Sequence, residues 1–320
     1  MAGCGHEGWT SLRNGKLPWR VEWAARWKIL GVTCEPFGKE HSAAGGSYDT
    51  SERISREVFD YPPPFPVPYE YILIGGKKMS SSKGNVFTIR QMLDVAPPDI
   101  PRFFFFRTYP NKHKEFSFPG DMLPLMDEFE RFERAHYGED QGFPEKEVED
   151  AKRAYVLSRL SPPPAKKSLV GYQHLQVVCQ VAKSWPEAVA VLARTGMEVD
   201  VNDAETKTKF EKAASYVDLH FPLEKKFTLA TEKPAVPLTD AQRKYASSLA
   251  DQLSQLQQWS PEVIHQVVHA LGKESGLGAG AAFQTVYLSF LARTNGPRAG
   301  FFLSSLDKEF VVCRLREMGT

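Results

Sequence analysis

The spacing of apolar residues changes along this chain of 320 residues. Up to about residue 120, short apolar runs such as WKILGV (27–32) and YEYILIGG (69–76) alternate with stretches rich in Gly and Pro. Such runs are typical of short strands separated by loops. Later in the chain, apolar residues recur every three or four positions, which is the period of an amphipathic helix. The pattern predicts an α/β part followed by an all-α part.

Helix signals are strongest after residue 120, where apolar spacing coincides with Ser, Thr or Pro starts and Gly stops. Helices are predicted within 124–138, 147–160, 239–259, 261–276 and 281–296. Trp19, Trp23 and Trp27 are spaced by four after Pro18, so they line one face of an earlier helix and are typical of a core stripe. The run RFFFFRT (102–108) is bounded by arginines and predicts a short buried strand.

Composition describes an ordinary globular chain, with 42% hydrophobic and 25% charged residues and a net charge of +1. A nucleic-acid surface would therefore need local basic patches. The four cysteines form no CxxC pair, which disfavours a disulfide framework or a complete zinc site and favours a cytoplasmic setting. We expect no secretory signal at the N-terminus and no membrane partner, because no apolar run reaches about 20 residues.

The segment GGKKMSSSKGN (75–85) places lysines around three serines between glycines, after an expected strand and before the helical-looking NVFTIRQML. A loop leaving a strand end is where α/β sheets bind ligands. The P-loop spacing GxxxxGK[ST] is not met. Two readings remain: a basic surface patch or modification site, and a clamp whose lysines neutralise charge on a pyrophosphate leaving group.

The segment EPFGKEHSAAGGSYDTS (35–51) combines an acid, a histidine and a glycine pair. Glycines allow a backbone to approach a ligand closely. Asp49 or Thr50 is expected to cap the following helix, whose N-terminus favours anions. The plainer reading is a tight turn before a capped helix, with His41 as a core histidine.

These motifs carry a family resemblance. KMSSS (78–82) resembles the KMSKS signature of class I aminoacyl-tRNA synthetases, and KKMSSSKGN resembles the form in class I lysyl-tRNA synthetases. Segments 16–59, 97–138 and 296–317 are similar to that family as well. The resemblance implies the second half of a Rossmann-like catalytic domain followed by an α-helical anticodon-binding domain. Its expected bounds are 1–84 for the partial catalytic domain, 85–150 for a helical connecting region that contacts the tRNA stem, and 151–320 for the anticodon domain.

The resemblance also implies roles for single residues. Lys78 would contact the ATP phosphates, and Ser81 stands where the signature has its second lysine, so we assign that second charge to Lys83. Glu40 stands where the family usually has Asp. The catalytic residues expected on this basis are Lys78, Ser80, Ser82 and Lys83. Those expected to bind ATP or the adenylate are Gly38, Glu40, His41, Gly45, Gly46, Lys78, Met79 and Ser81.

The implied substrates are lysine, ATP with its Mg²⁺, and tRNA(Lys). A local basic cluster would be either a solvated face or a seat for the tRNA backbone; it comprises Arg102, Arg107, Lys112 and Lys114. Single-stranded bases stack on aromatic side chains. Residues equally suited to that role or to the core are Trp259, Tyr287, Phe301 and Phe302.

The signature HIGH of the family's first catalytic half has no counterpart, since no H-x-G-H string occurs. Cys4 resembles the last thiolate of the family's metal-binding insertion, and one cysteine cannot build a zinc site, so no zinc is expected. We therefore predict a lysine–tRNA ligase chain that lacks its N-terminal half and activates lysine poorly by itself. The alternatives are a catalytically inactive tRNA-binding module and a class I synthetase of another specificity.

Overall fold

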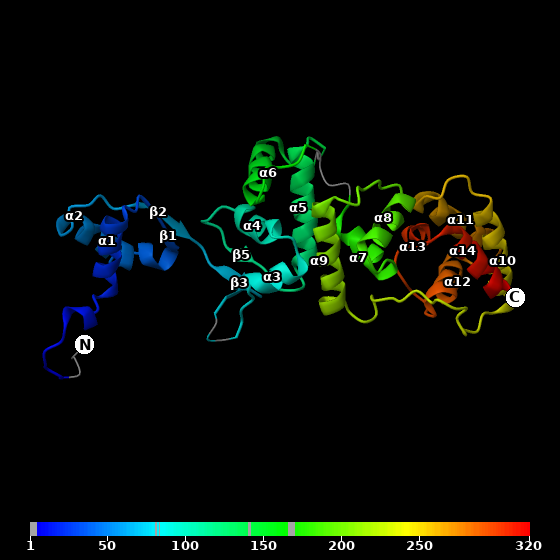
Figure 1. Cartoon of the computed structure of the whole chain (residues 1–320), viewed down its shortest axis with the longest axis horizontal. Helices are drawn as coiled ribbons and strands as arrows, with labels where there is room; N and C mark the ends of the chain where they lie inside the picture. Colours follow the sequence, from blue (N-terminus) through cyan, green and yellow to red (C-terminus); the bar gives the residue numbers. More distant parts are fainter. Residues whose placement is uncertain (1–4, 81, 83, 140–141, 166–169) are drawn as a thin grey trace. The chain divides into compact units, whose positions relative to one another are not determined.

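A computed structural model describes residues 5–80, 82, 84–139, 142–165 and 170–320 (Figure 1). The chain forms two compact units. Unit 1 combines Met1–Val86 with Thr108–Ser117, and unit 2 combines Phe87–Arg107 with Phe118–Thr320. The domain bounds expected at 84 and 150 stay a prediction.

Unit 1 mixes two longer helices with two small sheets. In the first sheet, β1 (Cys34–Gly38) pairs in parallel with β2 (Phe65–Tyr69). In the second, the strand order is β4 (Lys77–Lys78), β3 (Ile72–Ile74) and β5 (Lys114–Glu115), antiparallel on one side and parallel on the other. The other elements are α1 (Trp19–Leu30), α2 (Ser47–Glu57) and short 3₁₀ turns at Leu12–Asn14 and Lys39–Ser42.

The core of unit 1 is aromatic. Trp23 and Trp27 of α1 are buried against Phe37 of β1 and Tyr48 of α2. Trp23 contacts Phe37 edge-on with ring centroids 5.7 Å apart, and Phe37 stacks on Tyr48 at 4.7 Å. Trp19 is 50% exposed, so the predicted core stripe on α1 holds for two of its three tryptophans.

Two strand predictions from short apolar runs are wrong. The first four residues of WKILGV form the last turn of α1, which ends where Gly31 takes a left-handed conformation and donates its N–H to Lys28 O. RFFFFRT lies in α4 (Asp99–Phe106). There Phe103 and Phe104 are fully buried whereas Phe105 and Phe106 are exposed, a pairwise pattern that a helix produces and an alternating strand does not.

Unit 2 is helical apart from its connections, as the apolar period predicted. The five helices predicted after residue 120 are confirmed as α5 (Met122–His136), α6 (Glu145–Ser158), α10 (Asp240–Ser254), α11 (Pro261–Glu274) and α12 (Ala279–Leu291). The helix expected in NVFTIRQML begins at Ile89, because Thr88 caps it by accepting the Gln91 N–H. The remaining helices are α3 (Ile89–Val95), α4, α7 (Tyr172–Val181), α8 (Trp185–Arg194), α9 (Ala204–His220), α13 (Ala299–Ser305) and α14 (Lys308–Gly319).

The C-terminal helices share one large core. α10 packs along α14, and α11 packs against both α12 and α13 (Figure 1). Leu249, Ile264, Phe290, Phe302 and Leu315 are fully buried where these helices meet. Burying side chains of this size contributes roughly 2 kcal/mol each, so this cluster accounts for much of the stability of the C-terminal part.

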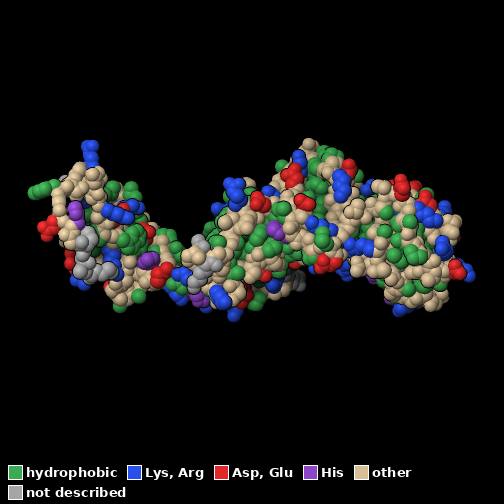
Figure 2. Space-filling model, turned by 90° about the horizontal axis from the view of Figure 1, so that it is seen from below, with side chains coloured by type: hydrophobic (Ala, Val, Ile, Leu, Met, Phe, Trp, Pro, Cys, Tyr) green, Lys and Arg blue, Asp and Glu red, His purple; other side chains and the backbone are tan. Residues whose placement is uncertain are grey.

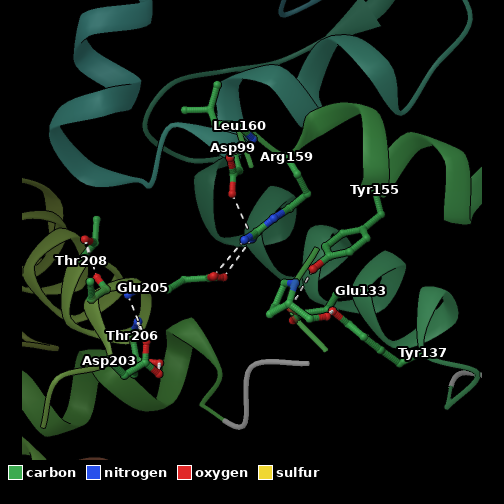
Figure 3. A network of polar contacts seen from close by, with 12 residues as sticks. Asp99, Glu133, Tyr137, Tyr155, Arg159, Leu160, Asp203, Glu205, Thr206 and Thr208 are labelled. Carbon is green, nitrogen blue, oxygen red and sulfur yellow. Dashed lines mark hydrogen bonds and ion pairs between the residues drawn. The ribbon is translucent and has the colours of Figure 1, made fainter. Parts of the chain in front are cut away.

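An ion network joins three helices of unit 2 (Figure 3). The Arg159 guanidinium, just after α6, forms a bidentate pair with Glu205 of α9 at 2.8 and 2.9 Å, and it lies 2.9 Å from Oδ2 of Asp99 in α4. Asp99 also accepts the Leu160 N–H at 2.9 Å. The two carboxylates lie in the first turns of their helices, where the macrodipole favours negative charge.

Charged side chains are mixed on the surface. Figure 2 shows Lys and Arg interspersed with Asp and Glu over the face in view, as the near-neutral net charge leads one to expect. Within the described part of the chain, no helix is both long and apolar enough to cross a membrane.

Candidate active site

Two glycines set the start of the lysine–serine loop, residues 75–85. β3 and β4 pair with Ile74 opposite Lys77, so Gly75 and Gly76 alone make the turn. Their φ angles are +57° and +71°, as a two-residue hairpin turn of the favoured twist requires. A side chain at either position would be strained. The glycine pair thus fixes the point at which Lys78 leaves the sheet.

Hydrogen bonds between polar groups close the base of this loop. The Ser80 N–H donates to the Asn85 main-chain oxygen at 3.1 Å and to its Oδ1 at 3.2 Å, and Asn85 Nδ2 donates to Lys78 O at 3.4 Å. Ser80 Oγ and Ser82 Oγ are 3.1 Å apart. Met79 donates its N–H to Ile72 O at 3.0 Å. The predicted site residues Ser81 and Lys83 lie outside the described residues.

The glycine–histidine segment forms a second turn in the same unit. Gly46 donates to Ala43 O at 2.7 Å, and a Cβ on Gly46 would lie 2.6 Å from the main-chain oxygens of both His41 and Ala43. Only glycine fits there without moving the backbone. Gly45 has φ +72°, and its N–H donates to Asp49 Oδ2 at 2.9 Å.

The capping expected from Asp49 or Thr50 is wrong. α2 begins at Ser47, so its N-cap is Gly46 and both side chains lie inside the first turn. Asp49 reaches back to Gly45, while Thr50 Oγ1 donates to Gly46 O at 2.9 Å. The glycine pair starts the helix earlier than the pattern of polar residues indicated.

Lys78 contacts the glycine–histidine turn directly. Its Nζ lies 3.7 Å from Glu40 Oε1 and 3.8 Å from the centroid of the Tyr71 ring. Both partners of the ion pair are about half exposed, and exposed pairs of this kind contribute at most about 1 kcal/mol. The contact therefore positions the Lys78 ammonium but leaves it exchangeable for a stronger anion.

Glu40 is held as a carboxylate. A hydrogen bond from its own backbone N–H lowers the pKa of Glu40 most, and Tyr71, Lys78 and His41 lower it further. His41 is half-buried, with its ring edge-on to Trp23 at 5.8 Å between centroids. Gly38 lies beside the carboxylate, since a Cβ there would come within 2.5 Å of Glu40 Oε2.

Several side chains of the site pack against the ring of Tyr71, a residue that sequence patterns alone did not single out. Lys39 Nζ lies 5.3 Å from its ring centroid, and the His113 ring stacks near it at 6.3 Å. Glu70 binds Lys39 at 2.7 Å and lies 3.3 Å from His113 Nδ1. His113 reaches this place because β5 pairs in parallel with β3, a long-range contact that no local pattern indicates. Tyr71, by contrast, could have been suspected as the last ring before the loop.

The predicted basic cluster divides between the units. Arg102 donates to the main-chain oxygens of Ser158 at 3.0 Å and Leu157 at 2.8 Å, and Arg107 pairs with Glu128, all within unit 2. In unit 1, Lys112 is exposed and Lys114 is buried. Both arginines thus have protein partners, and the tRNA contact assigned to these four residues stays a prediction.

The sequence left two roles open for four aromatic residues, stacking on RNA bases or packing in the core, and the structure separates them by their surroundings. Phe302 is fully buried in the C-terminal core. Trp259 donates to Leu306 O at 3.3 Å and Tyr287 to Pro297 O at 2.7 Å, and both pack on that core. Phe301 instead lines a pocket.

Metal binding has no visible support in the described ranges, where no group of three or more His, Cys, Asp or Glu side chains is placed to hold an ion. Cys4, the predicted remnant of a metal insertion, lies outside them.

Two family models match the chain. One, described as tRNA synthetases class I (K), matches residues 1–161, and one for an anticodon binding domain matches residues 178–318. The matches confirm the predicted fold class, a class I catalytic part followed by a helical anticodon-binding part.

Curated relatives match almost the whole chain. A lysine–tRNA ligase of Archaeoglobus fulgidus is 41% identical over 98% of this chain and 60% of the relative, and one of Methanosphaera stadtmanae is 35% identical over 98% and 62%. The chain thus spans about 60% of the length of these relatives. Among solved structures, a glutamate tRNA ligase from Elizabethkingia meningosepticum superposes with a TM-score of 0.38 at 17% identity, over 94% of this chain and 60% of that one.

Proposed function

Because the chain belongs to the family of tRNA synthetases class I (K), we propose that it carries the ATP-phosphate and tRNA-binding parts of a lysine–tRNA ligase. The matched ligases support lysine as the amino acid. The observation that carries the proposal is the meeting of Lys78 with Glu40, which brings the lysine–serine loop and the glycine–histidine turn into one site.

The proposed reaction begins with adenylate formation. A lysine carboxylate oxygen attacks the α-phosphorus of ATP. The bond between the α-phosphorus and the oxygen that bridges to the β-phosphate breaks, and pyrophosphate leaves with the electron pair of that bond. The ribose hydroxyl of the terminal tRNA adenosine then attacks the lysyl carbonyl and gives up its proton to the phosphate of AMP or to water, and AMP leaves with the electron pair of the broken bond between the carbonyl carbon and the phosphate oxygen. The first step builds negative charge on the pyrophosphate, so an ammonium aimed at the β- and γ-phosphates lowers its barrier.

Lys78 suits this role because its present anion is weakly held. A polyphosphate carries more charge than Glu40 and would displace that carboxylate, while Tyr71 keeps the ammonium in place. Ser80, Ser82 and Met79 would shape the loop around the phosphates, with Lys83 as the second cation. The magnesium that accompanies ATP belongs to the substrate.

The glycine–histidine turn would receive the adenosine part. Gly38, Gly45 and Gly46 keep side chains out of the turn, and Glu40, released from Lys78, would accept a hydrogen bond from a ribose hydroxyl. We place the activity in the cytoplasm, where tRNA and ATP are available, and assign the anticodon arm to the helices of residues 151–320.

Binding of tRNA is the first result to test. The purified chain is expected to bind lysine tRNA more tightly than non-cognate tRNAs, and the preference should persist as salt rises, because base contacts are not screened. The logarithm of the affinity should fall linearly with the logarithm of salt for every tRNA. Equal, salt-labile binding to all tRNAs would contradict specific recognition and leave only phosphate attraction.

An inactive tRNA-binding module is the second candidate, favoured by the missing H-x-G-H string. Lysine-dependent ATP–pyrophosphate exchange separates the two. We expect little exchange from this chain alone, and exchange well above background when the part of the relatives that it does not cover is supplied. Failure of the completed protein, with tRNA binding intact, would favour the inactive module.

A further inference from the structure

The ring of Tyr71 has a second ammonium beside it, which belongs to Lys39. Lys39 Nζ lies 5.3 Å from the ring centroid, and Lys78 Nζ lies 3.8 Å from it. Both distances are within the range of about 6 Å over which an aromatic ring attracts a cation. The two ammonium nitrogens can be no farther apart than the sum of these distances, so both cations belong to the same site.

The place of Lys39 follows from the first sheet of unit 1. β1 and β2 run in parallel, and their last paired residues are Gly38 and Tyr69. The next residue of each segment is charged, and Lys39 Nζ lies 2.7 Å from Glu70 Oε2 and 2.8 Å from its Oε1. A 3₁₀ turn begins at Lys39, whose main-chain oxygen accepts the Ser42 hydroxyl at 2.7 Å. The end of the sheet therefore fixes the backbone position from which the Lys39 side chain extends.

Glu70 is held more firmly than its partner. Its N–H donates to Pro110 O at 2.9 Å, and the Lys114 N–H donates to the main-chain oxygen of Tyr71 at 3.2 Å, so the backbone is held on both sides of this peptide. The Glu70 side chain is 18% exposed, against 42% for Lys39. An ammonium has three N–H groups, of which the two carboxylate oxygens occupy at most two. Lys39 therefore keeps a donor for a ligand that arrives from solvent.

The acids of the site are ionised and compete for its ammoniums. The hydrogen bond from Lys39 lowers the pKa of Glu70 most, and the charge of His113, whose Nδ1 lies 3.3 Å away, lowers it further. The pKa of Glu40, the partner of Lys78, is lowered as well. Two lysines thus face two carboxylates, and an incoming anion has to take the ammoniums from them. Removing a carboxylate charge should therefore strengthen the binding of that anion.

A linear polyphosphate has the charge and the length to contact both ammoniums. An ammonium nitrogen lies about 2.8 Å from a phosphate oxygen to which it donates. The oxygens of a triphosphate are spread along a chain of three phosphorus atoms, so two separate cations find acceptors on one molecule. A polyphosphate also carries more charge than either carboxylate that it has to displace. The site therefore suits a polyphosphate better than a single carboxylate.

We propose that Lys39 is a further phosphate-binding residue of this site, and that Lys39 and Lys78 together hold one polyphosphate chain beside Tyr71. Glu70 competes with the phosphates for Lys39 and keeps that lysine in place while no ligand is bound. That the polyphosphate belongs to ATP rests on the proposed function, whereas the pairing of the two lysines rests on the contacts within unit 1. A second cation lowers the barrier to adenylate formation in the same way as the first.

The plainer explanation gives the pair of Lys39 and Glu70 a structural role only, in which it ties the glycine–histidine turn to the end of β2. The two explanations differ in the sign of one effect. If the pair is structural, the loss of either partner damages the site. If Lys39 binds phosphate, the loss of the lysine charge weakens the binding of a polyphosphate, and the loss of the glutamate charge strengthens it.

Inorganic tripolyphosphate bound to the full chain tests the proposal, with the affinity measured by isothermal titration calorimetry at low salt and without divalent cations. Lys39→Gln removes the positive charge but keeps an N–H for Glu70, and it should weaken binding by about tenfold. Lys39→Arg keeps the charge and should bind within about threefold of the wild type. Lys16→Gln, at an exposed position before α1, is the matched control and should bind within about twofold.

Glu70→Gln gives the deciding sign. Glutamine keeps the size of the side chain and still accepts a hydrogen bond from Lys39, but it does not neutralise the ammonium. The affinity for tripolyphosphate should therefore rise by about threefold. Glu57→Gln removes the same charge at an exposed position of α2, and it should change the affinity by less than about 1.5-fold. Weaker binding by Glu70→Gln would show that the pair is structural and would overturn the proposal.

Lys78→Ala measured in parallel separates this inference from the proposed function. If it weakens binding while Lys39→Gln binds like the wild type, the assignment of Lys39 alone is overturned. Absence of tripolyphosphate binding by the wild type overturns that assignment together with the phosphate role of Lys78. Inorganic phosphate bound as tightly as tripolyphosphate would overturn the sharing of one chain by two lysines. Where thermal melting shows that Lys39→Gln does not fold, the sign found for Glu70→Gln decides.

Discussion

Replacing Lys78 with alanine should lower lysine-dependent ATP–pyrophosphate exchange on the order of 100-fold, about 3 kcal/mol of transition-state stabilisation. The assay uses this chain joined to the part of the Archaeoglobus fulgidus ligase that it does not cover. The physical reason is the loss of an ammonium held by Tyr71 and Glu40 beside the expected phosphates. The effect should fall mainly on kcat, because the charge that Lys78 meets grows as pyrophosphate leaves.

Lys77→Ala is the matched control. Lys77 is the other residue of β4, and successive strand residues point to opposite faces, so its ammonium should not reach the same phosphates. We expect less than about a threefold change. An equal loss in both variants would mean that only the general positive charge of the loop matters, and an unaffected Lys78→Ala would refute the role of Lys78.

Arg159→Met should lower the free energy of unfolding by about 3 kcal/mol, measured by chemical denaturation. Only 6% of the Arg159 side chain is exposed, and its removal leaves the carboxylates of Asp99 and Glu205 facing each other without a cation (Figure 3). Glu205 is 41% exposed and regains water, which keeps the loss below that of a fully buried pair.

Two further variants test whether the ion network of Arg159 is the cause of this loss of stability. Adding Asp99→Asn and Glu205→Gln to Arg159→Met should recover part of the loss, since neutral amides tolerate the missing cation. Arg153→Met, at an exposed position of α6, should change stability by less than about 0.5 kcal/mol. A loss as large at Arg153 would show that helix propensity or charge number is responsible and would contradict the network.

Helices were predictable from the sequence where one apolar face continued over several turns, as in α5, α10 and α11. Short apolar runs were misleading. In α4 four phenylalanines in a row conceal the period, and only the tertiary contacts show which two are buried. α9 was missed because Thr206 and Lys209, both polar, occupy part of its buried face.

The candidate site shows the same limit. The family resemblance singled out Lys78 and Glu40, and the structure places them in contact. It did not single out Tyr71 or His113, since their meeting depends on the pairing of β3 with β5. The pocket lined by Gln176 and Phe301 likewise joins residues that lie far apart in sequence.

The interleaving of the two units sets an order of events during synthesis. The sheet beneath the lysine–serine loop needs β5, and the Gly76 N–H finds the Glu115 carboxylate 39 positions further along the chain. At about 5–20 residues per second, a ribosome takes roughly 2 to 8 seconds to add that stretch, which includes α3 and α4 of the other unit. The nascent loop therefore emerges before β5 completes the sheet beneath it, and unit 1 reaches its final form only after part of unit 2 has left the ribosome.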